Sequence, residues 1–319
     1  MARTVDVAGL VDRALAGEPR AVARLISLVE TASPVLPEVA RALAPHTGRA
    51  WVVGLTGAPG VGKSTTTSAL VGALRARGQR VGVLAVDPSS PFSGGALLGD
   101  RVRMGAHATD PGVFIRSMAT RGHLGGLSWA TPQALRVLDA AGCDVVLVET
   151  VGVGQSEVEV VSLADTVAVL IAPGSGDGVQ AAKAGILEIA DVFVVNKSDR
   201  DGADATARDL KHMISLGRRD RAPTWRPPVV KAVASSGVGV DAVVGALDAH
   251  LAWMVEHGER DRRRARRAAG EVEAIAVERV RSRFGGLRGG AALDVLAKRV
   301  VAGELDPYAA ADLLVDGVG

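Results

Sequence analysis

Hydrophobic side chains near the amino terminus recur at the spacing of an amphipathic helix. Within residues 7–44 they fall three or four positions apart, until Pro34 and Pro37 interrupt the pattern. From Trp51 onward the pattern changes to short runs rich in β-branched residues, which alternate with amphipathic segments. The runs are 51–55, 81–86, 145–149, 167–172, 192–195 and 229–233. This alternation predicts an α/β fold with a mainly parallel sheet and helices on both of its faces.

The carboxyl-terminal part returns to a helical pattern from about Trp253. It contains an Arg-rich stretch at 259–267, a Gly-rich break at 285–290 and a final helix. Asp306 can cap this last helix, and Pro307 suits its first turn. The chain is therefore predicted to have three parts: an N-terminal helical extension at 1–48, an α/β domain at 49–252 and a C-terminal helical arm at 253–319.

Two segments of the predicted α/β domain fit neither helix nor strand. Residues 87–100 are rich in Pro, Ser and Gly and are long for a structureless connection, so we expect a mobile functional loop. Residues 218–228 predict a second irregular excursion, a surface loop to which the sequence assigns no chemistry.

The numbers of basic and acidic residues are nearly equal, at 37 Lys plus Arg and 35 Asp plus Glu. Such a balance predicts no general attraction to nucleic acid or to an anionic membrane. The stretch 259–267 interleaves acids with its arginines and has no aromatic residue, so we interpret it as a solvated, salt-bridged helix. Salt-sensitive DNA binding would favour the alternative, a patch that binds nucleic acid.

The sequence holds one cysteine, Cys143, which excludes an internal disulfide and a thiolate metal cluster within one chain. We expect a small hydrophobic side chain in a reducing compartment. Acidic and basic residues near the amino terminus interrupt the apolar stretch that a secretory signal requires. Runs such as Val167 to Ala172 are far shorter than the roughly 20 residues that span a bilayer. These features predict a cytoplasmic protein.

The glycine-rich segment G-A-P-G-V-G-K-S at 57–64 follows a predicted strand and opens a predicted helix. This is the context that a phosphate-binding P-loop requires, because its glycines let backbone N–H groups curl round the phosphates at a helix amino terminus. Lys63 is expected to reach the β and γ phosphates, and the Ser64 hydroxyl to bind magnesium. The predicted nucleotide-binding residues of this loop are Gly57, Ala58, Pro59, Gly60, Val61, Gly62, Lys63, Ser64 and Thr65.

The segment N-K-S-D at 196–199 ends another predicted strand, where a parallel sheet presents its ligand-binding loops. Asp199 can accept two hydrogen bonds from N1 and N2 of guanine, whereas adenine has an acceptor at N1 and no 2-amino group. Asn196 is expected to bond the edge of the base, and the stem of Lys197 to cover its face. Together with the P-loop, this segment predicts that the nucleotide is GTP.

Two further segments follow predicted strands. The loop 234–239 is expected to donate backbone N–H groups to O6 of guanine from Ala234 and Ser235, although such Gly-Ser turns are common. Glu149 ends a run of four apolar residues, and a carboxylate there can hold magnesium directly or through water. Gly152 stands where a γ-phosphate sensor is expected.

Five motifs together resemble the MeaB/ArgK family of P-loop GTPases, whose older name is LAO/AO transport system kinase. They are G-A-P-G-V-G-K-S, V-D-P-S-S-P-F-S-G-G-A-L-L-G-D-R, V-E-T-V-G-V-G-Q-S-E, G-D-G-V-Q-A-A-K-A-G-I-L-E-I-A-D and V-V-N-K-S-D. The resemblance extends over residues 17–250 and is less clear in the carboxyl-terminal region. It implies a GTPase of the dimer-forming class, with the C-terminal arm pairing two subunits. It also implies a chaperone that gates cofactor loading and protects an adenosylcobalamin-dependent acyl-CoA mutase, typically methylmalonyl-CoA mutase.

The resemblance also implies roles for single residues. It places Asp87 and Asp100 in a first switch and Lys183 in a further switch that communicates with the mutase. Magnesium would be held by Ser64, Asp87, Asp100 and Glu149, and the catalytic residues would be Lys63, Asp87, Asp100, Glu149 and Lys183.

Two positions depart from related patterns. Small Ras-like GTPases carry a Gln directly after the sensor glycine to orient the attacking water, and here that position is Val153. We therefore expect slow intrinsic turnover, raised when a partner or a second subunit completes the site. Gly178 follows Asp177 at a position where relatives commonly carry an acidic residue, so the further switch departs from the family pattern here.

Other functions fit the sequence less well. A MinD-like ATPase would need a second lysine at Ala58, and a nickel-delivery GTPase would have a His or Cys cluster. A signal-recognition GTPase would carry a Met-rich domain, but the chain has only five Met. The remaining alternative is a nucleotide-dependent kinase or ATPase of an amino-acid transport system.

Overall fold

The computed structural model describes residues 5–31, 33–88, 105–107, 109–120, 130–150, 163–174, 187–216, 225–283 and 291–316. The chain divides into two compact units, residues 1–263 and 264–319. The predicted boundaries at 48/49 and 252/253 stay a prediction.

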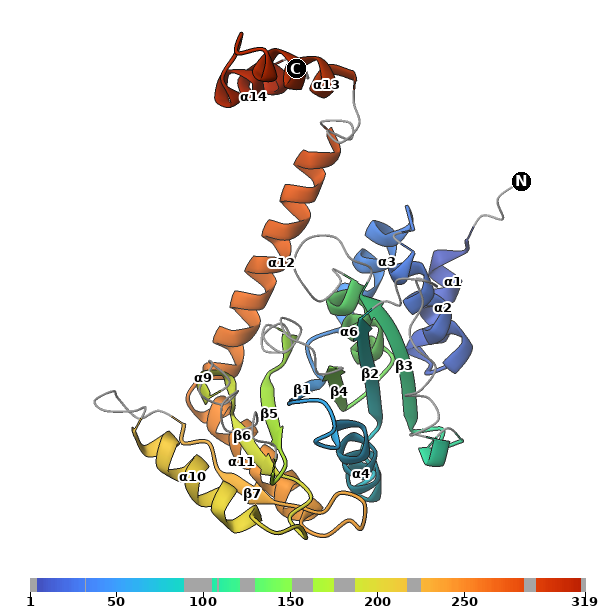
Figure 1. Ribbon diagram of the computed structural model, residues 1–319. Coiled ribbons are helices and arrows are strands. Elements are labelled where there is room, and N and C mark those ends of the chain that lie inside the picture. Colours follow the sequence, from blue (N-terminus) through green and yellow to red (C-terminus); the bar gives the residue numbers. More distant parts are fainter. Residues whose placement is uncertain are drawn as a thin grey trace. The chain divides into compact units, whose positions relative to one another are not determined.

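The first unit is built on a seven-stranded sheet with the strand order β3-β2-β4-β1-β5-β6-β7 (Figure 1). The strands are β1 Trp51–Thr56, β2 Val81–Pro88, β3 Val113–Thr120, β4 Val145–Thr150, β5 Thr166–Ile171, β6 Val192–Val195 and β7 Val229–Lys231. Every adjacent pair is parallel, which confirms the predicted α/β fold. The order reverses direction around β1, so the loops after β1, β4, β5 and β6 meet at one edge of the sheet.

Helices cover both faces of the sheet. The helices described in the first unit are α1 Val7–Leu15, α2 Pro19–Glu30, α3 Leu36–Leu43, α4 Lys63–Ala76, α6 Ala130–Ala140, α9 Leu187–Ile189, α10 Ala203–Leu216 and α11 Val240–Glu256, with short 3-10 turns at Ala44–His46 and Gly105–His107. On one face α4 and α11 bury Val53, Leu55, Leu70, Leu147, Leu170 and Leu247. On the other face α6 and the amino-terminal helices bury Leu25, Ile26, Leu84, Leu138, Val148 and Phe193. Successive residues of a strand thus pack into the hydrophobic cores on opposite faces of the sheet. This explains why these strands are continuous apolar runs.

The predicted N-terminal extension consists of three helices. Asp6 caps α1 by accepting a hydrogen bond from the Gly9 N–H at 3.0 Å. Gly17, with a φ of +79°, ends that helix, and Pro19 opens α2. The apolar side of α2 packs against α6 and β3, so the extension shares the core of the first unit.

The helix α12, Glu259–Arg283, begins in the first unit and continues into the second. The second unit also contains α13 Ala291–Val301 and α14 Pro307–Asp316. Asp306 accepts hydrogen bonds from the N–H groups of Tyr308 and Ala309 at 2.8 and 3.1 Å, which confirms the predicted cap of the final helix. The Gly-rich break at 285–290 and most of the predicted loops 87–100 and 218–228 lie outside the described residues. Among the helices that the structure does describe, none has the length and apolar character needed to cross a membrane.

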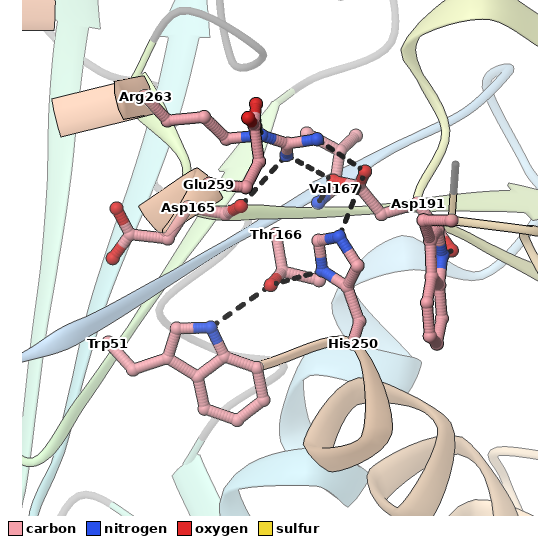
Figure 2. A network of polar contacts seen from close by, with 9 residues as sticks. Trp51, Asp165, Thr166, Val167, Asp191, His250, Glu259 and Arg263 are labelled. Carbon is pink, nitrogen blue, oxygen red and sulfur yellow. Dashed lines mark hydrogen bonds and ion pairs between the residues drawn. The ribbon is translucent and has the colours of Figure 1, made fainter. Parts of the chain in front are cut away.

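A buried polar network lies at the amino ends of β1, β5 and β6, away from the loops that follow these strands (Figure 2). Asp191 accepts two hydrogen bonds from the guanidinium of Arg263, at 2.7 and 2.9 Å. His250 places Nε2 3.2 Å from the Asp191 carboxylate and Nδ1 2.9 Å from the Thr166 hydroxyl, which accepts from Trp51 Nε1 at 3.1 Å. We call these five residues the Asp191 network.

The Asp191 carboxylate remains ionised although it is buried. Burial by itself raises its pKa, but the contacts with His250 and Arg263 outweigh burial and hold the pKa below its ordinary value. The network joins the starts of three strands to the amino-terminal end of α12.

Candidate nucleotide-binding site

The loop between β1 and α4 has a backbone conformation that depends on three glycines. Gly57, Gly60 and Gly62 have φ values of +143°, +78° and +97°, which side chains with a Cβ rarely adopt. A Cβ on Gly57 would lie 2.3 Å from the Leu170 carbonyl oxygen, and one on Gly62 would lie 2.4 Å from the amide nitrogen of Asn196. The loop leads directly into the first turn of α4, whose N–H groups have no acceptor within the helix. This geometry suits an anion such as a phosphate.

Lys63, the first residue of α4, folds back over this loop. Its side chain is buried, and its ammonium group donates to the carbonyl oxygens of Gly57 and Ala58 at 2.5 and 3.2 Å. The positive charge therefore lies at the centre of the loop, where the sequence places the β and γ phosphates.

Glu149 brings a buried carboxylate to the same loop from the neighbouring strand. It lies near the end of β4, opposite Leu55 of β1, and is 2% exposed. Ser64 donates to Oε1 at 2.5 Å, and Thr67 donates to Oε2 at 2.9 Å. Ser64 and Thr67 are one turn apart on α4, so both hydroxyl groups point at the carboxylate.

The loop after β6 contacts the phosphate loop through two side chains. Asn196 is 2% exposed, and its amide nitrogen donates to the Val61 carbonyl at 2.8 Å. Its amide oxygen accepts from the Ala234 N–H at 3.1 Å, so Asn196 links three of the predicted loops. Lys197 has a φ of +56°, unusual for a residue with a side chain, and donates to the Gly60 carbonyl at 2.6 Å.

The outer part of this site faces solvent. Asp199 and Ser235 are exposed, as are Pro59, Gly60 and Thr65 of the phosphate loop. The structure therefore brings together the loops predicted to hold phosphate, guanine and magnesium, and leaves an accessible carboxylate at Asp199. The contacts of each residue with a nucleotide stay predictions.

Several predicted residues cannot be placed in this site. Asp87 is the penultimate residue of β2, but its side chain is not among those that the structure describes. Asp100, Gly152, Val153 and Lys183 lie outside the described residues altogether, backbone included. Their roles in the switches and in the γ-phosphate sensor stay predictions.

Thr67 is the one residue of this cluster that the sequence analysis did not select. The signal for it was present, since a hydroxyl three positions after Ser64 on a helix lies on the same face. The same segment has hydroxyl groups at Thr65 and Thr66, however, and the sequence does not show which of them faces β4.

Comparisons with known proteins agree with this geometry. The profile of the family described as "Methylmalonyl Co-A mutase-associated GTPase MeaB" matches residues 22–287. A putative GTPase of Pyrococcus abyssi is 47% identical over 307 residues, covering 96% of this chain and 95% of the relative. The GTPase ArgK of Escherichia coli is 38% identical over 253 residues, covering 77% and 76% of the two chains. A solved structure named LAO/AO transport system kinase superposes with a TM-score of 0.73 at 27% identity, covering 100% of this chain and 99% of the other.

Proposed function

Because the chain belongs to the MeaB family of methylmalonyl-CoA mutase-associated GTPases, we propose that it uses GTP to assist an adenosylcobalamin-dependent acyl-CoA mutase. Relatives named as GTPases match the chain over 76% to 95% of their own length, and the chain is a GTPase of this family. The observation that carries the proposal is the family match over residues 22–287, since the family is described by its association with the mutase.

In the proposed site, the backbone N–H groups of residues 58–64 and the ammonium of Lys63 hold the triphosphate. Water attacks the γ-phosphorus, the bond to the β–γ bridging oxygen breaks, and GDP and inorganic phosphate leave. Lys63, already at the centre of the loop, stabilises the negative charge that moves onto the bridging oxygen. Asp199 selects guanine by accepting from N1 and N2, while Asn196, Lys197, Ala234 and Ser235 shape the base pocket.

The donor set at Ser64 and Glu149 suits magnesium, which prefers hard oxygen ligands. The two side-chain oxygens approach to 2.5 Å beside the phosphate loop. We propose that Ser64 and Glu149 hold the cation with Asp87 and Asp100 of the first switch. When bound, magnesium neutralises charge on the β and γ phosphate oxygens.

We further propose that the protein is a homodimer paired through its C-terminal arm. The second unit carries exposed apolar side chains that support this assignment, among them Val272, Val277, Val280, Val295, Val301 and Tyr308. With Val153 after the sensor glycine, an isolated chain should hydrolyse GTP slowly and respond to its partner. We place this activity in the cytoplasm, in keeping with a single, buried cysteine.

Capture of the mutase tests the proposal. The tagged full-length protein is isolated from its native cell with GTP and magnesium, in parallel with an Asp199→Asn control that should not retain GTP. We expect a cobalamin-dependent mutase with the wild type and less of it with the control. The purified mutase should also raise the rate of GTP hydrolysis. Absence of any mutase together with an unchanged rate would contradict the proposed partner.

The alternative, a kinase of an amino-acid transport system, is favoured by the name of the solved structure, LAO/AO transport system kinase. Incubation with γ-labelled GTP or ATP and a cell extract separates the two functions. Label that stays on another protein supports the kinase, whereas release of labelled phosphate supports the GTPase.

A further inference from the structure

The buried carboxylate of Glu149 is held on both of its oxygens by hydroxyl groups of one helix. Ser64 contacts Oε1, and Thr67, which is completely buried, contacts Oε2. A carboxylate restrained at one oxygen can still rotate about its last torsion, because that torsion is broad. Restraint at both oxygens fixes its plane and decides which oxygen faces the phosphate loop.

Thr67 is preset for this contact by its own helix. Its hydroxyl lies 3.0 Å from the Lys63 carbonyl one turn earlier and 2.9 Å from Glu149 Oε2. β-Branching leaves threonine few rotamers in a helix, and the one adopted here places the hydroxyl within reach of both acceptors. The single hydroxyl proton has two acceptors, and the ionised carboxylate is the stronger one. Thr67 therefore donates to Glu149 from one of the few rotamers that the helix allows it.

Ser64 and Thr67 differ in the contacts that their hydroxyl groups make besides the one with Glu149. In the proposed function, Ser64 serves the cation as well as Glu149, so its bond to the carboxylate changes as the site fills. Thr67 lies one turn farther along α4 and contacts Glu149 and the Lys63 carbonyl. Its restraint on the carboxylate does not depend on the cation.

We propose that Thr67 is a positioning residue for magnesium-dependent GTP hydrolysis. It holds Oε2 so that Oε1 of Glu149 faces Ser64 and the phosphate loop, where the cation is to bind. The inference rests on the proposed magnesium role of Ser64 and Glu149.

The test compares Thr67→Val, which keeps the shape and removes the hydroxyl, with Thr67→Ser, which keeps the hydroxyl. Thr206→Val is the matched control, since Thr206 on α10 is also buried and its hydroxyl also lies close to the carbonyl one turn earlier, at 3.0 Å from Gly202. Each full-length variant is assayed for kcat and KM with GTP, for the magnesium concentration that gives half-maximal rate, and for the affinity of a fluorescent GDP with magnesium or with chelator.

A hydrogen bond to a charged group contributes enough that its loss should change these quantities about tenfold. Thr67→Val should lower kcat and raise the half-maximal magnesium concentration by about that factor. GDP affinity in chelator and KM for GTP should stay within about twofold of the wild type. Thr67→Ser and Thr206→Val should behave as the wild type does. Thermal unfolding checks that each variant is folded, and Thr67→Ala replaces the valine variant if that one does not fold.

Equal kcat and magnesium dependence in Thr67→Val and the wild type would overturn the inference. Loss of activity in Thr67→Ser equal to that in the valine variant would overturn it too, because packing would then be the cause. A wild type without any magnesium dependence would instead refute the proposed cation site, and this inference with it. Glu149→Gln distinguishes the cases, since it must weaken the magnesium response whether or not Thr67 contributes.

Discussion

Asn196 joins the loops of the nucleotide site at the scale of single residues. Its amide nitrogen binds Val61 of the phosphate loop, and its amide oxygen binds the N–H of Ala234. Such a side chain shapes the site before it contacts any base. Its neighbour Gly62 must lack a side chain, because a Cβ there would lie 2.4 Å from the Asn196 amide nitrogen.

Gly62→Ala should therefore weaken GTP binding by more than tenfold. The methyl group displaces Asn196 and forces alanine to a positive φ, which costs about 1–2 kcal/mol by itself. Calorimetric titration with GTP measures the loss. Gly245→Ala is the control, since it adds the same methyl to the middle of α11 where nothing lies within 4 Å. Unchanged affinity in Gly62→Ala would show that the loop tolerates a side chain.

Cys143 should be chemically inert in the folded protein. Burial raises the pKa of its thiol to about 12, so almost no reactive thiolate is present at pH 8. Iodoacetamide should leave the native protein unlabelled for hours and label it within minutes in urea, as mass spectrometry would show. Rapid labelling of the native protein would mean that the thiol is accessible.

Among single residues, those that belong to a recognisable sequence motif could be predicted. The glycines, Lys63 and Ser64 were identifiable because only that order of residues forms a phosphate loop before a helix. Thr67 was not, since its role depends on which face of α4 turns toward β4. Asp191, His250 and Arg263 were also missed, because residues far apart in the chain meet only in the folded sheet.

At the scale of elements, the Asp191 network ties the amino ends of three strands to α12 (Figure 2). The Thr166 hydroxyl accepts from the Trp51 N–H and lies 2.9 Å from Nδ1 of His250, whose Nε2 lies 3.2 Å from the Asp191 carboxylate. Removing a partner from a buried polar network is costly, because the remaining groups are then left unpaired in a low dielectric.

Asp191→Asn should destabilise the protein by about 3 kcal/mol, because it leaves the charge of Arg263 without its buried partner. Urea unfolding followed by the fluorescence of the four tryptophans measures the change. Asp204→Asn is the matched control, because its pair with Lys231 is on the surface and its loss should change little. An equal effect of the two substitutions would contradict a special role for the network.

The same substitution should change the response to acid. The pKa of Asp191 is lower in the folded than in the unfolded chain, so its ionisation stabilises the fold above the ordinary Asp value of 3.8. That stability is lost as the pH falls from 3.8 through the lowered pKa. In Asp191→Asn this loss should be missing, and its stability should fall less steeply than that of the wild type in this range.

Sequence patterns predicted six of the seven strands. The exception is β3, whose segment V-F-I-R-S-M-A-T is interrupted by Arg116 and Ser117. This strand lies at the edge of the sheet, and Arg116 forms an ion pair with Glu30 of α2. Local periodicity cannot identify such a strand, because the charged residue within it is paired with a residue of a helix far away in the sequence.

At the scale of the whole molecule, the chain has two compact units, and α12 belongs to both. The helical character of the carboxyl-terminal region was predictable from its pattern and from the cap at Asp306. Its function as a pairing arm was not, since exposed apolar residues show that a surface binds something without showing what it binds.

Val272→Glu combined with Ile275→Glu should convert the proposed dimer to a monomer. Both side chains are exposed on α12, at 68% and 40%, and a charge on each opposes burial against a second subunit. Light scattering should show about half the wild-type mass, with GTP binding retained. Leu216→Glu adds the same charge at an exposed position on α10 and should leave the mass unchanged. A monomeric wild type would refute the pairing.

Guanine selection is the central claim, and calorimetric titration of GTP and XTP into the wild type and Asp199→Asn tests it most directly. The substitution turns an acceptor of two hydrogen bonds into a group that can also donate to the 2-carbonyl of xanthine. We predict strong heat with GTP and little with XTP for the wild type, and the reverse preference for the variant. No heat with GTP in magnesium buffer, or an equal loss of both nucleotides in the variant, would contradict the account.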